Sequence, residues 1–298
     1  MIGLFALFGN PISHTKSPLL HNYTFSRLFQ NLSSSGLYGR ILLENGKDLR
    51  QSFFAHGLCG ANITIPFKEE AFKQCDEVRG IARDIGACNT WVRERINERT
   101  GKGVGENVSE TQAKRPAQSP RVIGYNTDAE GFYLSIKDYA PKSALVLGAG
   151  GSSRAVCYAL RSHGIEPVVL NRSSKGLEFF ASRGFRCYVG DELDSGEFDM
   201  VINTTPAGLN DTSLPLEEGR LARLLKGARY AYDLIYGKQT PFLALAQAQG
   251  KHCQDGGAML LYQAVLAFEI FATHGLGVRL EREEIASVMS EIARGQII

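Results

Sequence analysis

The strongest fold signal in this 298-residue chain is Leu147-Gly148-Ala149-Gly150-Gly151-Ser152-Ser153-Arg154. The motif follows a continuous apolar segment, 144–147, and precedes a segment with helical periodicity that runs through Arg161. The first glycine permits a tight turn, and the second lets backbone N–H groups approach a pyrophosphate at a helix N-terminus. Ser153 replaces the third glycine of the G-x-G-x-x-G pattern, so a purely structural turn stands as the alternative to a dinucleotide site.

The segments around this motif predict a parallel sheet. Apolar runs at 167–170, 200–202 and 230–232 read as further buried strands, which indicates βαβ organisation. Towards the N-terminus, strands again alternate with helices, and the first helix is expected to have Ser17 as its N-cap and Pro18 at its first position. The strands expected there are 2–8, 39–43, 61–65, 89–92 and 122–125. At roughly 150 residues per domain, the predicted fold class is α/β with two domains.

The composition excludes several classes of protein. Hydrophobic residues make up 44% and charged residues 21%, while 33 Lys+Arg against 31 Asp+Glu gives no support to a nucleic-acid partner. The six cysteines contain no C-x-x-C pair and the six histidines no H-E-x-x-H spacing, so we expect free thiols in a reducing cytoplasm and no metal site. Uninterrupted apolar runs fall far short of the ~18–20 residues that span a bilayer, so no membrane association is expected.

The segment Arg93–Arg121 differs from the rest of the chain. It is rich in charge, glycine and proline and has almost no large apolar residues. This composition predicts a mobile hairpin tip, with a lid or partner-binding loop as the functional alternative.

The choice of cofactor is indicated by Asn171-Arg172-Ser173-Ser174-Lys175, which follows the second strand of the glycine-motif half. An NAD site normally carries an acid there to hold the ribose 2′-hydroxyl. Here no acid repels a 2′-phosphate and two cations attract it, which favours NADP. The alternative is that Arg172 and Lys175 are only solvated surface cations.

Four polar constellations complete the pattern. In chain order they are Gly9-Asn10-Pro11-Ile12-Ser13-His14-Thr15-Lys16-Ser17-Pro18, Asn62-Ile63-Thr64-Ile65-Pro66-Phe67-Lys68-Glu69, Gly86-Ala87-Cys88-Asn89-Thr90 and Asn126-Thr127-Asp128. Together with the glycine motif and Gly256-Gly257-Ala258-Met259-Leu260-Leu261-Tyr262-Gln263-Ala264, they make the chain resemble the shikimate dehydrogenase family nearly end to end. The resemblance is absent only over the polar segment 93–121.

The resemblance implies a substrate domain at 1–128, to which 259–298 returns, and a Rossmann-like NADP domain at 129–258. It implies reversible NADP-dependent reduction of 3-dehydroshikimate to shikimate, as a step of aromatic amino acid biosynthesis, by a monomer or homodimer. The implied catalytic pair is Lys68 and Asp128. The implied substrate residues are Thr15, Lys16, Ser17, Asn62, Thr64, Asn89, Asp128, Tyr236 and Gln263. The implied cofactor residues are Gly148, Ala149, Gly150, Gly151, Ser152, Asn171, Arg172, Ser173, Lys175, Thr204, Leu234 and Gly256.

The chemistry of individual residues agrees with these roles, although some of the residues also fit a structural role. Ser17 begins a helix, where exposed N–H groups favour a carboxylate. A cation in the first turn of a helix, as at Lys68, is opposed by the helix dipole, which favours release of its proton. Asp128 also fits a helix cap, and Gln263 a hydrogen bond to backbone.

One departure from the family pattern concerns substrate range. Thr15 replaces the more usual first serine, and its extra methyl group bears on tolerance of a bulkier acid such as quinate. A quinate/shikimate dehydrogenase of broader specificity is therefore one alternative. A catalytically silent NADP- or shikimate-sensing protein is another, which the intact Lys68 and Asp128 disfavour.

Overall fold

The computed structural model describes residues 2–13, 15–94 and 120–293. The chain divides into two compact units, Met1–Thr127 with Ala264–Ile298 and Asp128–Gln263. Most of the polar segment predicted to be a hairpin tip, residues 95–119, lies outside the described residues. Its described ends are paired, since the Glu94 N–H donates to the Arg121 carbonyl at 2.9 Å and Arg121 donates to the Glu94 carboxylate at 3.1 Å.

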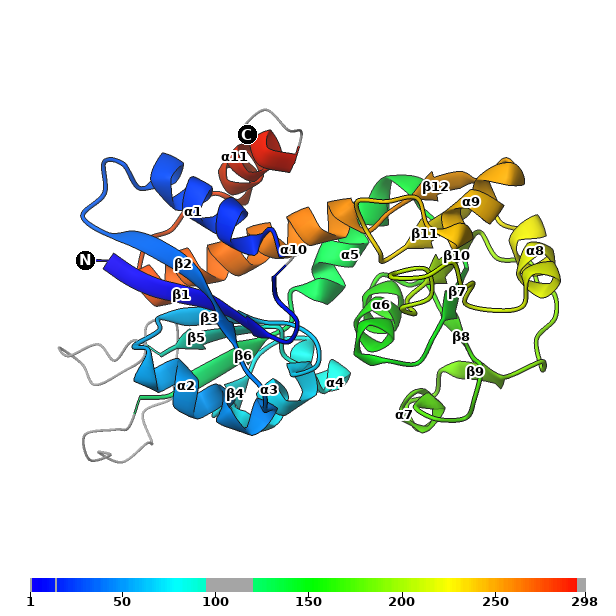
Figure 1. The fold of residues 1–298 in the computed structure, drawn as a ribbon, viewed down its shortest axis with the longest axis horizontal. Coiled ribbons are helices and arrows are strands. Elements are labelled where there is room, and N and C mark those ends of the chain that lie inside the picture. Colours follow the sequence, from blue (N-terminus) through cyan, green and yellow to red (C-terminus); the bar gives the residue numbers. More distant parts are fainter. Residues whose placement is uncertain (1, 14, 95–119, 294–298) are drawn as a thin grey trace. The chain divides into compact units, whose positions relative to one another are not determined.

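The first unit contains a six-stranded mixed sheet in the order β2-β1-β3-β5-β6-β4 (Figure 1). Its strands are β1 Ile2–Gly9, β2 Ser35–Leu42, β3 Gly60–Ile63, β4 Glu77–Val78, β5 Thr90–Arg93 and β6 Val122–Tyr125. Strand β1 pairs in parallel with β2 and β3, whereas β5 runs antiparallel to β3 and β6. The carboxyl ends of β1 and β3 and the amino end of β5 therefore lie at one edge of the sheet.

Helices cover both faces of this sheet. They are α1 Ser17–Leu28, η1 Gly46–Asp48, α2 Leu49–Ala55, α3 Lys68–Gln74, α4 Ala82–Ile85, the π-helical turn η3 Phe271–Leu276 and α11 Arg282–Ala293. On one face the Phe5 ring lies 5.3 Å from that of Phe25 in α1 and 4.9 Å from that of Phe271 in η3. On the other face Phe8 and Phe53 are fully buried in the core under α2 and α3. Burial of these apolar side chains fixes the helices to the sheet.

Two sequence expectations for this unit need correction. Ser17 is not the N-cap of the first helix but its first residue, and Lys16 is the cap. The reason is local: Lys16 makes no side-chain capping bond, and the Thr15 hydroxyl oxygen, two residues before Ser17, accepts the Ser17 N–H at 3.2 Å. The strand expected at 39–43 runs from Ser35 to Leu42, because the run Ser33–Gly36 and Gly39 are residue types of turns, which hide the start of the strand in the sequence.

The second unit contains six strands that all pair in parallel, in the order β12-β11-β10-β7-β8-β9. The strands are β7 Ala144–Leu147, β8 Pro167–Asn171, β9 Arg186–Val189, β10 Met200–Asn203, β11 Tyr230–Asp233 and β12 His252–Gln254. The helices are α5 Asp128–Ile136, η2 Lys137–Tyr139, α6 Gly151–Ser162, α7 Leu177–Ala181, α8 Glu218–Lys226, α9 Pro241–Ala248 and the start of α10 Gly257–Ile270. The α/β fold class with parallel βαβ organisation is confirmed.

The sequence analysis identified the four central strands of this sheet and missed its two edges. Strands β9 and β12 lie at the ends of the strand order and are largely half-exposed or exposed. An edge strand does not need the continuous apolar run that a central parallel strand needs. The hydrophobic pattern therefore carries no signal for them.

The helical stretch Gly257–Leu276 is long and apolar enough to cross a membrane by length and composition alone, with a mean hydropathy of 1.3. Of its most apolar window, 56% is buried inside the protein, a property that the core helices of folded domains share. The expectation of no membrane association stays a prediction.

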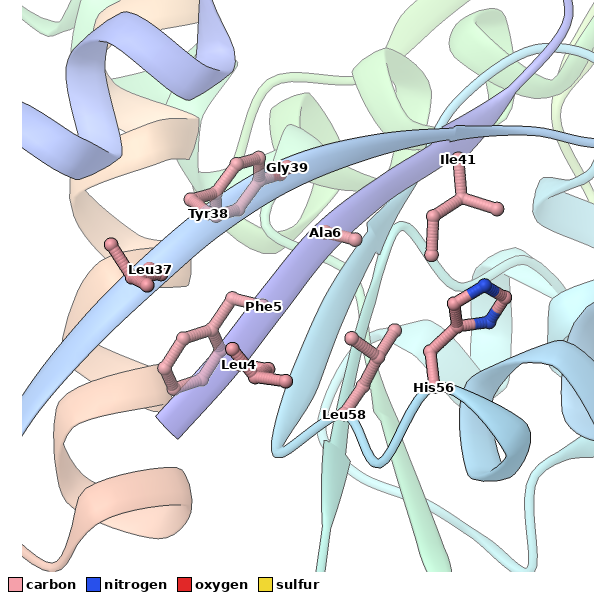
Figure 2. Close-up of a pocket in the computed structure, with 9 residues that line it drawn as sticks. All are labelled: Leu4, Phe5, Ala6, Leu37, Tyr38, Gly39, Ile41, His56 and Leu58. Carbon is pink, nitrogen blue, oxygen red and sulfur yellow. The ribbon is translucent and has the colours of Figure 1, made fainter. Parts of the chain in front are cut away.

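A pocket of about 310 Å³ opens beside β1 and β2 of the first unit (Figure 2). Leu4, Leu37 and Ile41 line it together with His56 and Leu58 from the end of α2 and the loop that follows. Its lining is almost entirely apolar and includes none of the predicted substrate residues, so it does not match the polar site that the sequence predicts.

Candidate active site

The loop that connects β1 to α1 carries three predicted substrate residues in an ordered conformation. The Thr15 hydroxyl donates to the Ser17 hydroxyl oxygen at 3.0 Å, and Arg40 of β2 donates to the Thr15 carbonyl at 2.9 Å. Ser17 is buried, with 7% of its surface exposed, whereas Lys16 is exposed. The loop therefore holds the Ser17 hydroxyl at the start of a helix, where backbone N–H groups favour an anion.

The Ser17 hydroxyl begins a chain of polar groups through the first unit. It lies next to the Tyr38 hydroxyl, which donates to Asn62 Oδ1 at 2.7 Å. Asn62 Nδ2 in turn donates to Thr90 Oγ1 at 3.1 Å and to the Asn89 carbonyl at 3.4 Å. Ser17, Tyr38, Asn62 and Thr90 come from α1, β2, β3 and β5, so these hydrogen bonds connect several elements of the first unit.

The chain continues to the end of β6. The Thr90 hydroxyl donates to Asn89 Oδ1 at 3.1 Å, and Asn89 Nδ2 donates to Thr127 Oγ1 at 2.9 Å. The Thr127 N–H returns a bond to Asn89 Oδ1 at 2.8 Å. Thr127 is followed directly by Asp128, the first residue of α5, which is 7% exposed. We refer to Ser17, Tyr38, Asn62, Thr90, Asn89 and Thr127 as the polar chain.

The structure thus brings Ser17, Asn62 and Asn89, which the motifs predicted, into one network. Tyr38, Thr90 and Thr127 were missed. Thr90 and Thr127 lie within two of the sequence motifs, each directly after an asparagine, so the sequence did contain a signal for them. Tyr38 had none, because a tyrosine in a strand is ordinary and only the packing of α1 on β2 places its hydroxyl beside Asn62.

Burial keeps the polar chain neutral. Tyr38 is 4% exposed, and burial raises its pKa well above the usual value, so the hydroxyl remains a donor. The ring of His21 stacks on the Tyr38 ring at 4.3 Å between centroids, and burial lowers the His21 pKa to about 3. The site consequently presents uncharged donors and acceptors, which suit a ligand with several hydroxyl groups.

Lys68 is the first residue of α3 and is half-buried. Its carbonyl accepts the Cys88 N–H at 2.9 Å, so the start of α3 is tied to the residue that precedes Asn89. Thr64 is fixed by its own backbone: its N–H donates to the Phe8 carbonyl at 2.9 Å and its carbonyl accepts the Phe67 N–H at 3.0 Å. Lys68 and Thr64 thereby share the strand edge that carries the polar chain.

In the second unit, the glycine motif forms a turn between β7 and α6. Gly148 has a φ of 110°, which only glycine adopts without strain, and a Cβ there would lie 2.8 Å from Thr204 Oγ1. Thr204 donates to the Leu147 carbonyl at 2.6 Å and shares a 2.6 Å bond with the fully buried Ser153 hydroxyl. Ser153 also accepts the Gly150 N–H at 3.2 Å. The serine that replaces the third glycine therefore ties the turn to β10 as well as fitting the close packing.

The turn leaves space where a phosphate is expected. A Cβ built at Gly150 or at Gly151 meets no atom within 4 Å. Gly150 is the N-cap of α6 and Gly151 is its first residue. The first backbone N–H groups of this helix provide an anion site. Ala149 and Ser152 belong to the same turn and helix start. The geometry fits the pyrophosphate of a dinucleotide.

The predicted phosphate-selecting loop lies against this turn. Asn171 Nδ2 donates to the carbonyls of Ser173 and Lys175, at 2.9 and 3.1 Å, and so closes the loop on itself. Arg172, Ser173 and Lys175 are exposed. A Cβ at Gly176 would lie 2.7 Å from the Ala149 carbonyl, which shows how closely the loop approaches the glycine turn. The two cations are thus available to a bound anion.

The remaining predicted residues lie at the ends of β11 and β12 and in α10. A Cβ at Gly256 would lie 2.2 Å from the Leu234 carbonyl, so only glycine permits this approach. Tyr236 is 39% exposed, and partial burial raises its pKa. Gln263 Nε2 donates to the Leu260 carbonyl at 2.9 Å. This is the bond to backbone that the sequence analysis gave as the alternative to a ligand contact. Gln263 Oε1 can still accept a hydrogen bond from a ligand. Among the described residues there is no cluster of three or more potential metal ligands.

Comparison with known proteins gives these sites a context. A family model described as the shikimate dehydrogenase substrate binding domain matches residues 7–91. The chain is 51% identical over 294 residues to shikimate dehydrogenase (NADP(+)) of Helicobacter hepaticus, covering 98% of this chain and 100% of that protein. It is 43% identical to the enzyme of the same name from Helicobacter pylori (strain ATCC 700392 / 26695), over 90% of this chain and 92% of that protein. The chain belongs to the shikimate dehydrogenase family.

Solved structures agree with membership of the shikimate dehydrogenase family. Shikimate dehydrogenase from Aquifex aeolicus superposes with a TM-score of 0.73 at 29% identity, covering 96% of this chain and 97% of that one. Shikimate 5-dehydrogenase from Thermus thermophilus, in complex with NADP(H) and shikimate, gives a TM-score of 0.71 at 27% identity, covering 97% and 99%. The predicted family and the predicted cofactor, NADP, are both confirmed.

Proposed function

We propose that this chain catalyses the reversible NADP-dependent reduction of 3-dehydroshikimate to shikimate, in the cytoplasm and as a step towards aromatic amino acids. The observation that carries the proposal is the polar chain. It gathers neutral hydroxyl and amide groups from three strands, β2, β3 and β5, and from the segments next to them. These groups lie beside a helix start that suits a carboxylate and in the same unit as Lys68. A small polyhydroxylated acid matches this set of groups.

In this proposal the second unit holds the cofactor. The N–H groups at Gly150 and Gly151 and the start of α6 bind the pyrophosphate, while Ala149 and Ser152 line the turn. Arg172 and Lys175 bind the 2′-phosphate, helped by the loop that Asn171 and Ser173 shape. Thr204, Leu234 and Gly256 lie at strand ends, towards the nicotinamide. Bound NADPH supplies the hydride.

The residues that we assign to the substrate come mainly from the first unit, with Asp128, Tyr236 and Gln263 from the second. Thr15, Lys16 and Ser17 bind the carboxylate, helped by Tyr236, because hydroxyl donors and a cation match a carboxylate at a helix N-terminus. Asn62, Thr64, Asn89 and Gln263 bind the ring hydroxyls. Lys68 gives a proton to the carbonyl oxygen as hydride arrives, and takes it back in the reverse direction. Asp128, the other member of the proposed catalytic pair, accepts a hydrogen bond from a neighbouring substrate hydroxyl.

Steady-state assays test the proposal directly. The purified protein is assayed with shikimate and with quinate, each with NADP and with NAD, by the appearance of the reduced nicotinamide. We expect shikimate with NADP to give the highest kcat/KM. Comparable rates with quinate would favour the broader quinate/shikimate enzyme that Thr15 leaves open. Binding of NADP and shikimate without turnover would favour the sensing protein.

The assembly and the excluded partners stay predictions. A monomer or homodimer is expected, without nucleic acid or membrane association. Size-exclusion chromatography with light scattering checks the first of these, and the result has no bearing on the assignment of the reaction.

A further inference from the structure

Two of the six cysteines meet inside the first unit. Cys75 is the C-cap residue of α3, and Cys88 lies in the loop just before β5. The two sulfur atoms lie close to one another beside Gly124, near enough for each thiol to shift the pKa of the other. The Cys75 thiol itself donates to the Phe72 carbonyl at 3.2 Å.

The space for this pair is provided by Gly124 of β6. A Cβ at Gly124 would lie 2.6 Å from the Cys88 sulfur and 2.8 Å from the Cys75 sulfur. Both distances are far below a normal van der Waals contact, so any side chain at 124 would displace the thiols. The absence of a side chain there lets two sulfur atoms from different elements converge on one point above the sheet.

The pair is chemically asymmetric. Cys88 is fully buried, and its pKa is raised, first by its side-chain interaction with Cys75 and then by burial. Cys75 is half-exposed, and the side-chain interaction with Cys88 lowers its pKa, with Arg50 acting in the same direction and Asp76 against it. An accessible, more acidic thiol beside a buried partner is the arrangement of a peroxide-sensitive cysteine with its resolving cysteine.

We propose that Cys75 and Cys88 are an oxidative modification site that closes reversibly to a disulfide, with a hydroperoxide as the oxidant. With hydrogen peroxide, the Cys75 sulfur attacks one oxygen and the O–O bond breaks. The departing hydroxide takes the Cys75 proton, so the products are a Cys75 sulfenic acid and water. The Cys88 sulfur then loses its proton and attacks the Cys75 sulfur, so that an S–S bond forms and the hydroxyl leaves as water. Two thiols and one hydrogen peroxide give one disulfide and two waters. A dithiol reverses the closure by thiol–disulfide exchange.

Closure of this disulfide has a consequence for the candidate active site, which rests on the proposed function. Covalent S–S distances are about 2.05 Å, shorter than any contact between thiols, so the two side chains must move towards each other and pull on the segments that carry them. One segment is the end of the short helix that begins at Lys68. The other carries Asn89, and the Cys88 N–H is bonded to the Lys68 carbonyl. Oxidation is therefore expected to lower kcat/KM for shikimate by about 10–100-fold, since misplacement by an ångström costs that much.

The test uses the full-length protein, reduced and then treated with hydrogen peroxide. Remaining thiols are blocked with iodoacetamide, and the protein is digested without reduction for mass spectrometry. We expect a crosslinked peptide that joins Cys75 to Cys88, with the loss of two hydrogens and full reversal by dithiothreitol. Cys75→Ser and Cys88→Ala should each abolish the crosslink, and Cys75→Ser should make turnover insensitive to mild peroxide.

Cys157 and Cys187 provide a matched control inside the same chain. Burial, and to a smaller extent the nearby Cys187, raises the Cys157 pKa, and burial raises the Cys187 pKa too, so neither thiol is made more acidic by the other. We expect both to remain alkylated under conditions that close the Cys75–Cys88 pair. Alkylation of Cys75 and Cys88 after peroxide, or overoxidation of Cys75 without a crosslink, would overturn the proposal.

Formation of the Cys75–Cys88 crosslink and its effect on turnover are measured separately. A crosslink that forms without any change in turnover would overturn the effect on the active site. Failure of the proposed function would appear as no shikimate-dependent reduction of NADP by the reduced protein, whereas the crosslink is measured by mass alone.

Discussion

The two units build their candidate sites from different materials. In the first unit the site is made of side chains: the polar chain passes from a serine through a tyrosine, an asparagine and a threonine, and each group is oriented by the next. In the second unit the site is mainly backbone, in a turn where Gly148 has a positive φ and Gly150 and Gly151 leave space for a ligand. One site depends on which side chains are present and the other on where side chains are missing.

This difference predicts different responses to substitution. A buried polar network loses orientation when one hydroxyl is deleted, because the remaining groups are left without partners. A backbone site tolerates changes in nearby side chains and is damaged by an added Cβ. Variants in the two units should consequently separate into effects on the substrate and effects on the cofactor.

The largest effect is expected for Lys68→Ala. Removing the proton donor should lower kcat by about 10²–10⁴-fold, the usual contribution of general acid–base catalysis, with little change in the KM for NADP. Lys73→Ala is the control, because Lys73 is an exposed lysine on the same short helix. Steady-state rates and thermal melts of both variants make the check. Near-normal turnover of a folded Lys68→Ala protein would assign proton transfer to another group.

The second expected effect lies in the other unit. Arg172→Ala removes a charge-assisted contact to the 2′-phosphate of about 1.5–3 kcal/mol, so the KM for NADP should rise by about 10–100-fold. The KM for NAD should change far less. Arg186→Ala, which removes another exposed arginine of the same unit, should leave both values unchanged. Equal losses with NADP and NAD would exclude a contact with the 2′-phosphate.

The difference between a side-chain site and a backbone site also explains which parts of each site the sequence could predict. The glycine turn was predictable because its requirements are local: a buried strand, small residues at fixed spacing and a helix start all lie within 147–154. The asparagines of the first unit were found only through their motifs and the family resemblance. Their hydrogen-bond partners depend on which strands become neighbours, and the order β2-β1-β3-β5-β6-β4 is not visible in any local window.

Tyr38 shows where local reasoning stops. Its backbone N–H and carbonyl are both bonded by the side chain of Asn22 in α1, at 2.8 and 2.9 Å, because β2 is the edge strand and has a free side there. This clamp sets the position of the Tyr38 hydroxyl next to Asn62. It is produced by the packing of a helix on a sheet edge, and sequence spacing does not encode it.

The pH dependence of stability probes the packing behind the polar chain. His21 has a folded pKa of about 3 against an ordinary value of 6.5, because burial disfavours the charged ring. The unfolded chain therefore takes up the proton first, so stability is fully present above about pH 6.5 and is lost as the pH falls towards 3. Between pH 7 and pH 5 the loss should be about 2 kcal/mol.

Urea unfolding at several pH values checks this expectation. His21→Phe keeps an aromatic ring and removes the ionisation, so its stability should fall less steeply between pH 7 and pH 5. His252→Ala is the control, since His252 is exposed and an exposed imidazole is solvated in both states. An unchanged slope in His21→Phe would show that other groups govern the acid sensitivity.

The smallest effect separates the two units most sharply. Tyr38→Phe keeps the ring and deletes the hydroxyl that orients Asn62, so the KM for shikimate should rise by about fivefold, or ~1 kcal/mol, with the KM for NADP unchanged. Tyr232→Phe is the matched control, because Tyr232 is a fully buried tyrosine of the second unit whose hydroxyl bonds Ser135 at 2.9 Å. Each variant deletes one hydroxyl from a buried tyrosine ring, and their melting temperatures should fall by similar amounts. Only Tyr38→Phe should change the KM for shikimate, because only that hydroxyl belongs to the polar chain. A rise of equal size in Tyr232→Phe would mean that the loss of stability alone, and not the orientation of Asn62, weakens substrate binding.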